Sequence, residues 1–307
     1  MNRAFDIDLI RTRGLTGAER RTLERRAADG VYERVRPGVL VRAHTLADLR
    51  ADERHALLIR ATAPYITEPF VLSHESACAL LGLPVISAWP DRVHAADSST
   101  GTTRVTARLT RHGVRDRPVT AHTEVLGFRT TTAARTAVDI ASRRATLVAV
   151  PIVDHVLRTN QTTRAALQQE LSRLQTGGTK ARAVVEMAST LSGSPAESMC
   201  RVRFRQLGTP EPVQQHGFHR SGERSAVVDF WFPDQGVVVE VDGRAKYEDP
   251  DMLAGSTTAE AHWREKQRED FIRSFPEVRF VVRLTWTDLL HPERIRAALR
   301  RAGVPCR

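Results

Sequence analysis

Three acidic residues occur within two short apolar runs in the last third of this 307-residue chain. Asp229 lies in the run VVDFW, and Glu240 and Asp242 lie in the run VVVEVD. Carboxylates in apolar strands are costly unless they are paired or bind a metal, and a hard divalent cation relieves the repulsion between clustered carboxylates. A Mg²⁺ ion bound to carboxylates and a substrate phosphate polarises the phosphorus centre and lowers the pKa of an attacking water. These residues therefore predict a Mg²⁺-dependent hydrolytic centre, with Mn²⁺ as a substitute.

The two apolar runs are expected to form a hairpin that positions these acids. The run around Asp229 and the run at 237–241 are joined by a tight turn at 233–236. Strand side chains alternate, so Glu240 and Asp242 share one face and the valines between them share the other. If the strands pair about the turn, Asp229 approaches the same acidic face. The alternative is that Glu240 and Asp242 are exposed residues at a strand end, where a turn begins.

Lysine is rare in this chain, and its positions are informative. Only Lys180, Lys246 and Lys266 occur, and the last two lie in the same C-terminal region as the acids. An ammonium group is a compact point charge that orients a water or a phosphate. Either Lys246 or Lys266 is therefore a candidate for that role. Lys266 also precedes Asp270 by four residues on an expected helix, which is the spacing of a plain surface ion pair.

Glu197 is a further candidate, on the helix that precedes these strands. The segment Ser194-Pro195-Ala196-Glu197 has the signature of a capping box, with proline at the first helical position. Helix capping alone explains Glu197, so a role beside the metal stays an alternative at this point.

The elements around these residues predict an α/β sheet with helices packed on it. From residue 191 onward the expected order is helix, three strands, helix, strand and helix. The expected ranges are 196–208, 211–220, 225–232, 237–243, 259–275, 278–286 and 292–303.

The first fifty residues predict a helix followed by a hairpin. Thr16 is a candidate cap for a helix through residues 17–30, in which Leu23 and Ala27 share one face. Two β-rich runs then flank the turn at 36–38. A helix followed by a basic hairpin is typical of the end of a winged helix-turn-helix, which binds DNA. A small α+β subdomain is the alternative.

The middle of the chain, residues 47–191, predicts a mixture of helices and strands. Helices are expected at 51–64, 73–84, 132–144, 148–159 and 161–175, with strand-like pieces at 91–96, 103–110 and 118–132. The Gly177-Gly178 pair reads as a linker or a helix stop. The six histidines between residues 44 and 122 show no metal-ligand spacing and are expected to be surface or satisfied core residues. They are His44, His55, His74, His94, His112 and His122.

Composition favours a polyanionic partner. Lysine and arginine outnumber aspartate and glutamate by 46 to 36, a formal charge of +10, which suits binding to phosphates. The alternative is a general arginine bias of the source proteome. No run of eighteen apolar residues and no secretory leader is evident, so neither a membrane span nor export is expected. Three widely spaced cysteines favour a reducing cytoplasm.

The segment VVDFWFPDQGVVVEVDGRAKY resembles the core motif of the PD-(D/E)XK nuclease superfamily, in its very-short-patch-repair-endonuclease-like branch. The likeness spans roughly residues 193–303. It implies that Asp229 and Glu240 are metal ligands and that Glu197 supports the metal or its waters. The superfamily's acid-any-lysine motif is altered here, because Asp242 stands where lysine is expected. The lysine role would then move to Lys246 or Lys266; relatives of this branch tolerate another basic residue near 246.

The front of the chain resembles the AbiEi-type antitoxins of abortive-infection systems. The likeness covers about residues 8–160, in the segments VYERVRPGVLVRA, VLSHESACALLGLP, RHGV and GFRTTTAARTAVDIA. It implies a DNA-binding N-terminal module and a bacterial setting.

Together these patterns predict an α/β (α+β multidomain) chain of three parts: a winged-helix-like module at 1–50, a mixed α/β region at 51–190 and a restriction-endonuclease-like domain at 191–307. The leading expectation is a cytoplasmic, Mg²⁺-dependent DNA endonuclease, with Asp242 and Glu197 assisting the two metal ligands. The rival is a non-enzymatic, antitoxin-like DNA-binding regulator whose nuclease fold is inactive, and a structural DNA-associated protein is the third alternative. A toxin or self-association partner is left open.

Overall fold

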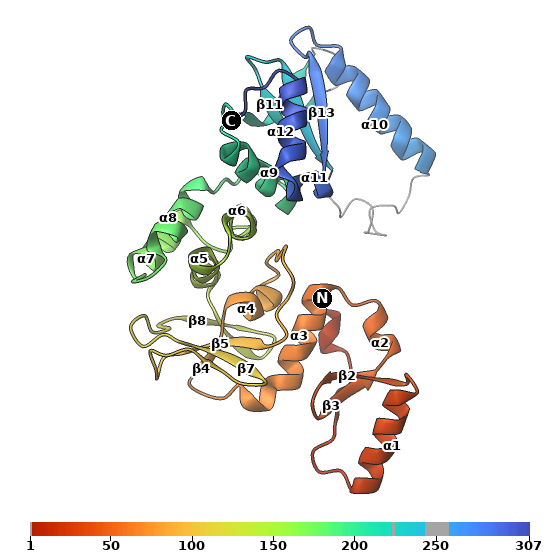
Figure 1. Ribbon diagram of the computed structural model, residues 1–307, viewed down its shortest axis with the longest axis vertical. Helices are drawn as coiled ribbons and strands as arrows, with labels where there is room; N and C mark the ends of the chain where they lie inside the picture. Colours follow the sequence, from red (N-terminus) through yellow and green to blue (C-terminus); the bar gives the residue numbers. More distant parts are fainter. Residues whose placement is uncertain (1, 221, 223–224, 243–257) are drawn as a thin grey trace. The chain divides into compact units, whose positions relative to one another are not determined.

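The computed structural model describes residues 2–220, 222, 225–242 and 258–307 (Figure 1). The fold is mixed α/β with three sheets, as the sequence predicts for the class. The chain divides into two compact units. One comprises Met1–Arg143 and Thr162–Ala181, and the other comprises Arg144–Gln161 and Arg182–Arg307. Among the described residues, no helix has the length and apolar character needed to cross a bilayer.

The first unit begins with the predicted helix and hairpin. Helix α1 (Gly17–Ala28) is capped by Thr16, whose hydroxyl accepts from Glu19 N (3.3 Å) while Glu19 accepts from Thr16 N (2.7 Å). Strands β2 (Tyr32–Arg36) and β3 (Val39–Arg42) form the hairpin, and the short strand β1 (Ile10–Arg11) pairs with β3. The predicted cap, helix and hairpin are confirmed.

The rest of this unit surrounds a six-stranded mixed sheet of order β6-β7-β5-β4-β9-β8. The pairs β5–β7 and β4–β9 are parallel, and the other pairs are antiparallel. Its strands are β4 (Phe70–Leu72), β5 (Val93–Asp97), β6 (Arg104–Val105), β7 (Leu109–Gly113), β8 (His122–Val125) and β9 (Phe128–Thr131). Its helices are η1 (Arg3–Phe5), α2 (His44–Ala47), α3 (Ala51–Thr62), η2 (Ala63–Tyr65), α4 (His74–Leu81), α5 (Ala133–Arg143) and α7 (Arg164–Ser172).

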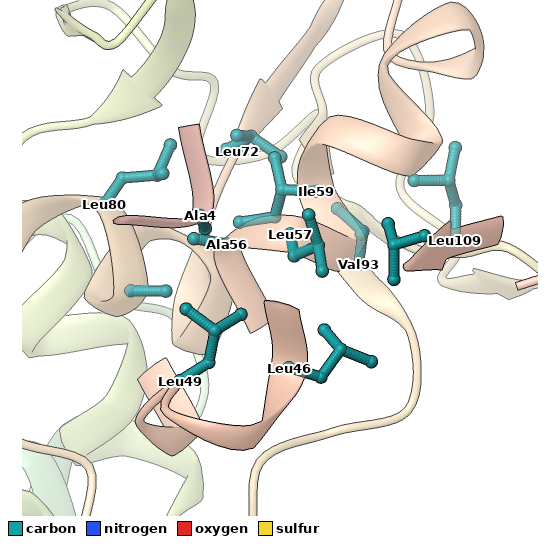
Figure 2. Close-up of a cluster of buried hydrophobic side chains, with 12 residues drawn as sticks. Ala4, Leu46, Leu49, Ala56, Leu57, Ile59, Leu72, Leu80, Val93 and Leu109 are labelled. Carbon is teal, nitrogen blue, oxygen red and sulfur yellow. The ribbon is translucent and has the colours of Figure 1, made fainter. Parts of the chain in front are cut away.

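Helix α3 supplies the centre of the core of this unit. Figure 2 shows its side chains Ala56, Leu57 and Ile59 at the middle of a cluster, with Leu80 of α4 on one side and Leu109 of β7 on the other. Each of the three α3 side chains is at most 1% exposed. Burying such side chains contributes roughly 1.5–3 kcal/mol each for the large ones, so α3 ties the N-terminal hairpin to the six-stranded sheet within one unit.

From residue 191 onward the second unit has the predicted helix, three strands, helix, strand and helix in that order, with one additional helix, α11 (Trp286–Leu290), before the last. Its sheet has the order β10-β11-β12-β13, with antiparallel β10–β11 and β11–β12 pairs and a parallel β12–β13 pair. The strands are β10 (Val213–His219), β11 (Ser225–Phe232), β12 (Val237–Asp242) and β13 (Phe280–Thr285). The helices are α6 (Thr146–Arg158), α9 (Pro195–Gln206), α10 (Thr258–Arg273), α11 (Trp286–Leu290) and α12 (Pro292–Arg301). A further helix, α8 (Gly178–Met187), begins at the second glycine of the Gly-Gly pair, contains the unit boundary after Ala181 and was not predicted.

Helices cover both faces of this second sheet. Phe204 of α9 packs edge-on against Phe230 and Phe232, with ring centroids 5.1 and 5.3 Å apart. Ile272 of α10 instead lies in a buried cluster with Trp231 and Val238. Because neighbouring side chains of a strand point to opposite faces, α9 and α10 must lie on opposite sides of the sheet.

The three-part division at residues 50 and 190 stays a prediction. The two compact units describe how the chain packs, and the winged-helix and nuclease identities of its parts are not decided by packing alone.

Candidate functional site

Asp229 lies where the pairing of β11 and β12 ends. The paired residues are Phe232 with Val237, Trp231 with Val238 and Phe230 with Val239. Beyond them, the carboxylate Oδ2 of Asp229 accepts a hydrogen bond from the backbone N–H of Val241 at 2.8 Å. A side chain of β11 therefore takes the place of a backbone acceptor, and Asp229 is held directly against the acidic end of β12.

The alternation of β11 changes face at the same position. Ala226 and Val228 share the α10 side with Trp231, whereas Phe230 packs against α9. Strict alternation would place Val228 and Phe230 on the same face. The strand is therefore irregular between Val228 and Phe230, and Asp229 lies half-buried at this position. This local break in alternation is what lets Asp229 approach the acids of β12, as predicted.

The turn between the two strands depends on Gly236. Its φ is +64°, and a Cβ there would lie 2.5 Å from the carbonyl oxygen of Glu277. Its own carbonyl accepts from the N–H of Arg279 (2.7 Å). Glycine thus lets the hairpin lie against the start of β13 and fixes the register of β12.

Glu240 is the most deeply buried acid of β12, at 9% exposed. Its Oε1 accepts from Arg268 of α10 at 2.8 Å. Burial raises the pKa of Glu240 to about 7, with Arg268 opposing the increase and Asp229 adding to it. Glu240 therefore gains and loses a proton near neutral pH, which is the range in which a carboxylate serves as a general base or exchanges its proton for a cation.

Glu197 combines helix capping with proximity to Asp229. Ser194 is the N-cap of α9, and its hydroxyl accepts from Glu197 N (3.2 Å). The Glu197 carboxylate accepts from the Ser194 hydroxyl and Gly193 N (2.8 Å each) and from Gln215 Nε2 (3.0 Å). Burial, and then the charge of Asp229, raises the pKa of Glu197. Capping and site membership are thus compatible, because Asp229 acts on both Glu197 and Glu240.

Asp242 has a different environment from the other acids. It ends β12 opposite Thr285 of β13 and is half-buried. Arg283 of β13 is bonded to Glu265 (2.8 Å) and Glu269 (2.9 Å) of α10. Burial lowers the pKa of Arg283, but these two carboxylates, followed by Asp242, outweigh burial and raise it. Asp242 therefore belongs to a chain of charges that runs between β13 and α10.

Of the two candidate lysines, only Lys266 lies among the described residues, and no contact with the acids is found for it. Lys266 lies on α10 with an exposed side chain, and among the described residues it makes no ion pair with Asp270. Lys246 lies outside the described residues. The basic group that contacts Glu240 is Arg268, which also donates to the carbonyl of Val227 (2.6 Å).

Arg268 is the site residue that sequence reasoning missed. A signal was present, since residues 265, 268, 269 and 272 fall on one helical face. Ile272 on that face is 1% exposed, so its neighbours one turn earlier had to face the sheet. Lys266 falls off this face, which explains its exposure.

A buried ion pair anchors the helix that carries Glu197. Asp154 of α6 and Arg201 of α9 are each 2% exposed in their side chains and contact one another directly. Asp154 also accepts from the Ser198 hydroxyl (2.7 Å) and from Ser189 N (2.8 Å). These bonds satisfy both carboxylate oxygens and fix α9 against α6.

The carboxylates of the site are the type of ligand that a hard cation prefers, but they are too few to fill its coordination shell. Across the described residues, no three side chains among His, Cys, Asp and Glu are grouped closely enough to hold a metal. Mg²⁺ commonly uses only one or two carboxylates, with water and substrate phosphate completing its shell. Asp229 and Glu240 meet that requirement in chemistry. Burial, and then the charge of Asp229, raises the pKa of Glu240 and of Glu197, and a bound cation would offset both effects.

Comparison with known proteins adds nothing to this geometry, since no family model and no curated protein matches the chain.

Proposed function

We propose that the chain is a Mg²⁺-dependent DNA endonuclease that hydrolyses phosphodiester bonds at the Asp229–Glu240 site, within a PD-(D/E)XK-like domain. The observation that carries the proposal is the pairing of two carboxylates at the point where β11 and β12 separate. One of them is bonded to the backbone of the neighbouring strand (2.8 Å), and the other has a pKa of about 7 because it is buried. Acids so placed in an apolar sheet need a function to offset their cost.

Each residue has a distinct part in this proposal. Asp229 and Glu240 would hold the ion, and Glu197 would orient its waters while capping α9. A bound Mg²⁺ supplies a polarised phosphate and a more acidic water. Arg268, bonded to Glu240 at 2.8 Å, carries the positive charge that a lysine provides in the resemblance. With a side chain 34% exposed, its guanidinium reaches both the carboxylate and solvent, where a scissile phosphate would lie.

Helix α1 supports a role for DNA in the proposal. It has no buried residue, and it exposes Arg20, Arg21, Arg25 and Arg26. Among the described residues, none of the four forms an ion pair, unlike most of the arginines near the acidic site. Unpaired arginines on one exposed helix suit contacts with a phosphate backbone. This surface is the DNA-docking element of the proposed winged-helix module.

A nuclease panel tests the proposal. Wild type, Asp229→Asn and Glu240→Gln are incubated with Mg²⁺ and nicked, mismatched, single-stranded and duplex DNA. Both amides keep an acceptor for Val241 N–H or Arg268, so the fold should persist while the charges are lost. We expect cleavage to fall by at least about a hundredfold, and Glu277→Gln, an exposed glutamate of the same unit, to cleave as wild type does. Unchanged cleavage by both site variants would refute the assignment.

A non-enzymatic DNA-binding regulator is the second candidate, and one observation favours it. Both site carboxylates already have hydrogen-bond donors within the protein: Asp229 accepts from the N–H of Val241, and Glu240 accepts from Arg268. A thermal melt with and without Mg²⁺ or Mn²⁺ discriminates between the two, because an ion that binds only the folded state raises the melting temperature. Stabilisation that disappears in Glu240→Gln supports the nuclease; no stabilisation, with DNA binding intact, supports the regulator.

A further inference from the structure

A polar cavity of about 570 Å³ lies within the N-terminal unit. Its lining residues come from the start of α4, from the loop before β6, from β7 and the loop after it, from α5 and from the segment before α8. Four of them are charged or polar and almost completely buried: His74 (4% exposed), Arg117 (8%), Arg135 (3%) and Asp139 (5%). The volume is that of a small-molecule site, and none of these residues takes part in the acidic site.

Arginine dominates the charged wall of this cavity. Arg117, Arg135 and Arg143 line it together with two aspartates, Asp116 and Asp139. Asp139 is neutralised, because it accepts from Arg117 (2.6 Å) and from Arg135 (2.9 Å). Arg117 also bonds to Glu170 (2.8 Å), which Arg173 shares at 3.5 Å. Arg143 donates to His112 Nδ1 (3.1 Å) and has no carboxylate partner among the described residues. The three arginines of the wall therefore carry more positive charge than its two aspartates neutralise.

Two buried nitrogens of the lining residues have no acceptor. Among the described residues, His74 Nε2 and Arg117 Nε make no hydrogen bond. Burial lowers the pKa of His74 well below its ordinary value, so its ring is neutral. Its Nδ1 lies 3.0 Å from the Ser73 hydroxyl; when that hydroxyl donates, the ring proton is on Nε2. Buried donors are normally satisfied in native proteins, so this pair of donors points to a missing acceptor.

The start of helix α8 adds a third source of donors. Gly177 lines the cavity, and Ala181 N donates to its carbonyl at 3.0 Å. The N–H groups of residues 178–180 precede this bond and form the positive end of the helix. Gly177 has a φ of +71°, and a Cβ there would lie 2.8 Å from the carbonyl oxygen of Ser142. Only glycine lets this helix begin so close to α5.

We propose that this cavity binds a small organic anion through a phosphate group. Phosphate oxygens only accept hydrogen bonds, which matches a wall of arginines, a neutral histidine N–H and a helix N-terminus. The cavity is larger than a phosphate group alone requires, so the rest of the ligand occupies the remaining volume beside Val114 and Leu174.

Calorimetric titration of the full chain with inorganic phosphate, and separately with acetate, tests this proposal. We expect saturable phosphate binding that is at least about tenfold weaker in Arg143→Gln, since it loses a charge-assisted bond. His74→Asn should weaken binding about fivefold or more; asparagine tolerates the positive φ of +51° at this position and lacks an atom at Nε2.

The matched control is Arg104→Gln, which makes the same charge change at an exposed arginine of the same unit outside the cavity. It should bind phosphate as wild type does. Because Arg143 is exposed, its variant keeps the test valid even if His74→Asn fails to fold. Absence of saturable phosphate binding, equal binding of acetate, or binding that Arg143→Gln leaves unchanged would each overturn the proposal.

Discussion

Glu240→Gln has a predicted effect on stability that depends on pH and requires no metal. The pKa of Glu240 is about 7 in the folded chain against an ordinary value of 4.5. Each pKa unit corresponds to about 1.4 kcal/mol, so ionising this buried carboxyl costs the folded state about 3.5 kcal/mol. Glutamine does not ionise, and it keeps an acceptor for Arg268. The variant therefore escapes the cost.

The sign follows from where the two states titrate. As the pH rises from about 4.5 to 7, the unfolded chain loses this proton while the folded chain keeps it, so the free energy of unfolding of the wild type falls. Above pH 7 both states are ionised and the effect is constant. Between pH 5 and 8.5 the wild type should lose about 2.5 kcal/mol relative to Glu240→Gln. The contact with Arg268 strengthens as Glu240 ionises, and its opposing effect is already contained in the pKa of about 7.

Urea unfolding at several pH values, followed by tryptophan fluorescence without divalent ions, measures this difference. A Trp89→Phe background removes the tryptophan of the N-terminal unit, so the signal comes from Trp231, Trp263 and Trp286 of the C-terminal unit. With m-values of about 1–3 kcal/mol per molar urea, the relative midpoint should move by roughly 1 to 2 M. Glu277→Gln, at an exposed position, should follow the wild type.

Parallel curves for wild type and Glu240→Gln would refute the reasoning. A wild type that gains stability with pH relative to the variant would refute it more sharply. That result would mean that Arg268, at 2.8 Å, outweighs burial and lowers the pKa of Glu240.

Three further outcomes follow from the contacts. Arg268→Ala should abolish DNA cleavage, whereas Arg268→Lys should retain part of it. Lys266→Ala should cleave nearly as wild type does, because Lys266 is exposed and does not lie on the helix face that contacts the site. A cleavage assay in which Lys266→Ala loses more activity than Arg268→Ala would contradict the role of Arg268. Asp154→Ala should destabilise the C-terminal unit by about 3–5 kcal/mol in denaturant unfolding, because it leaves Arg201 buried and unpaired; a loss below about 1 kcal/mol would show that water reaches the pair. Replacing Arg21 and Arg25 by glutamine should lower the slope of log affinity for duplex DNA against log salt by up to about 2, and an unchanged slope would place DNA elsewhere.

Local sequence rules predicted the elements well where their signals are local. Thr16, the turn at Gly38 and the stop at Gly82 (φ +68°) are set by nearby residues. Helix α8 was missed because the Gly177-Gly178 pair resembles a linker, whereas here Gly177 accepts the bond from Ala181 N that opens the helix. Strand β4 was missed because it has only three residues, Phe70–Leu72, too few to show alternation.

Contacts between residues far apart in the sequence could not be predicted from residue spacing. His74, His94 and His112 have no ligand-like spacing in the sequence, yet α4, β5 and β7 bring their ring centroids within 3.8 to 6.0 Å of one another. Their closeness follows from tertiary structure, and burial lowers the pKa of His112 to about 2, with neighbouring His74 adding to the effect. The break in β11 at Asp229 is similar, since it depends on how two faces of the sheet are covered.

The aspartate in place of the expected lysine is balanced by charges on neighbouring elements. Arg283 lies opposite Glu240 on β13 and is the cation on which Asp242 acts. Arg268 of α10 supplies a second cation directly to Glu240 (2.8 Å). A lysine at 242 would stand on the same face as both arginines and repel them, whereas aspartate completes the charge balance. In the proposed nuclease, the positive charge of the site lies on α10 and not on β12, and the side chain on which catalysis depends is Arg268.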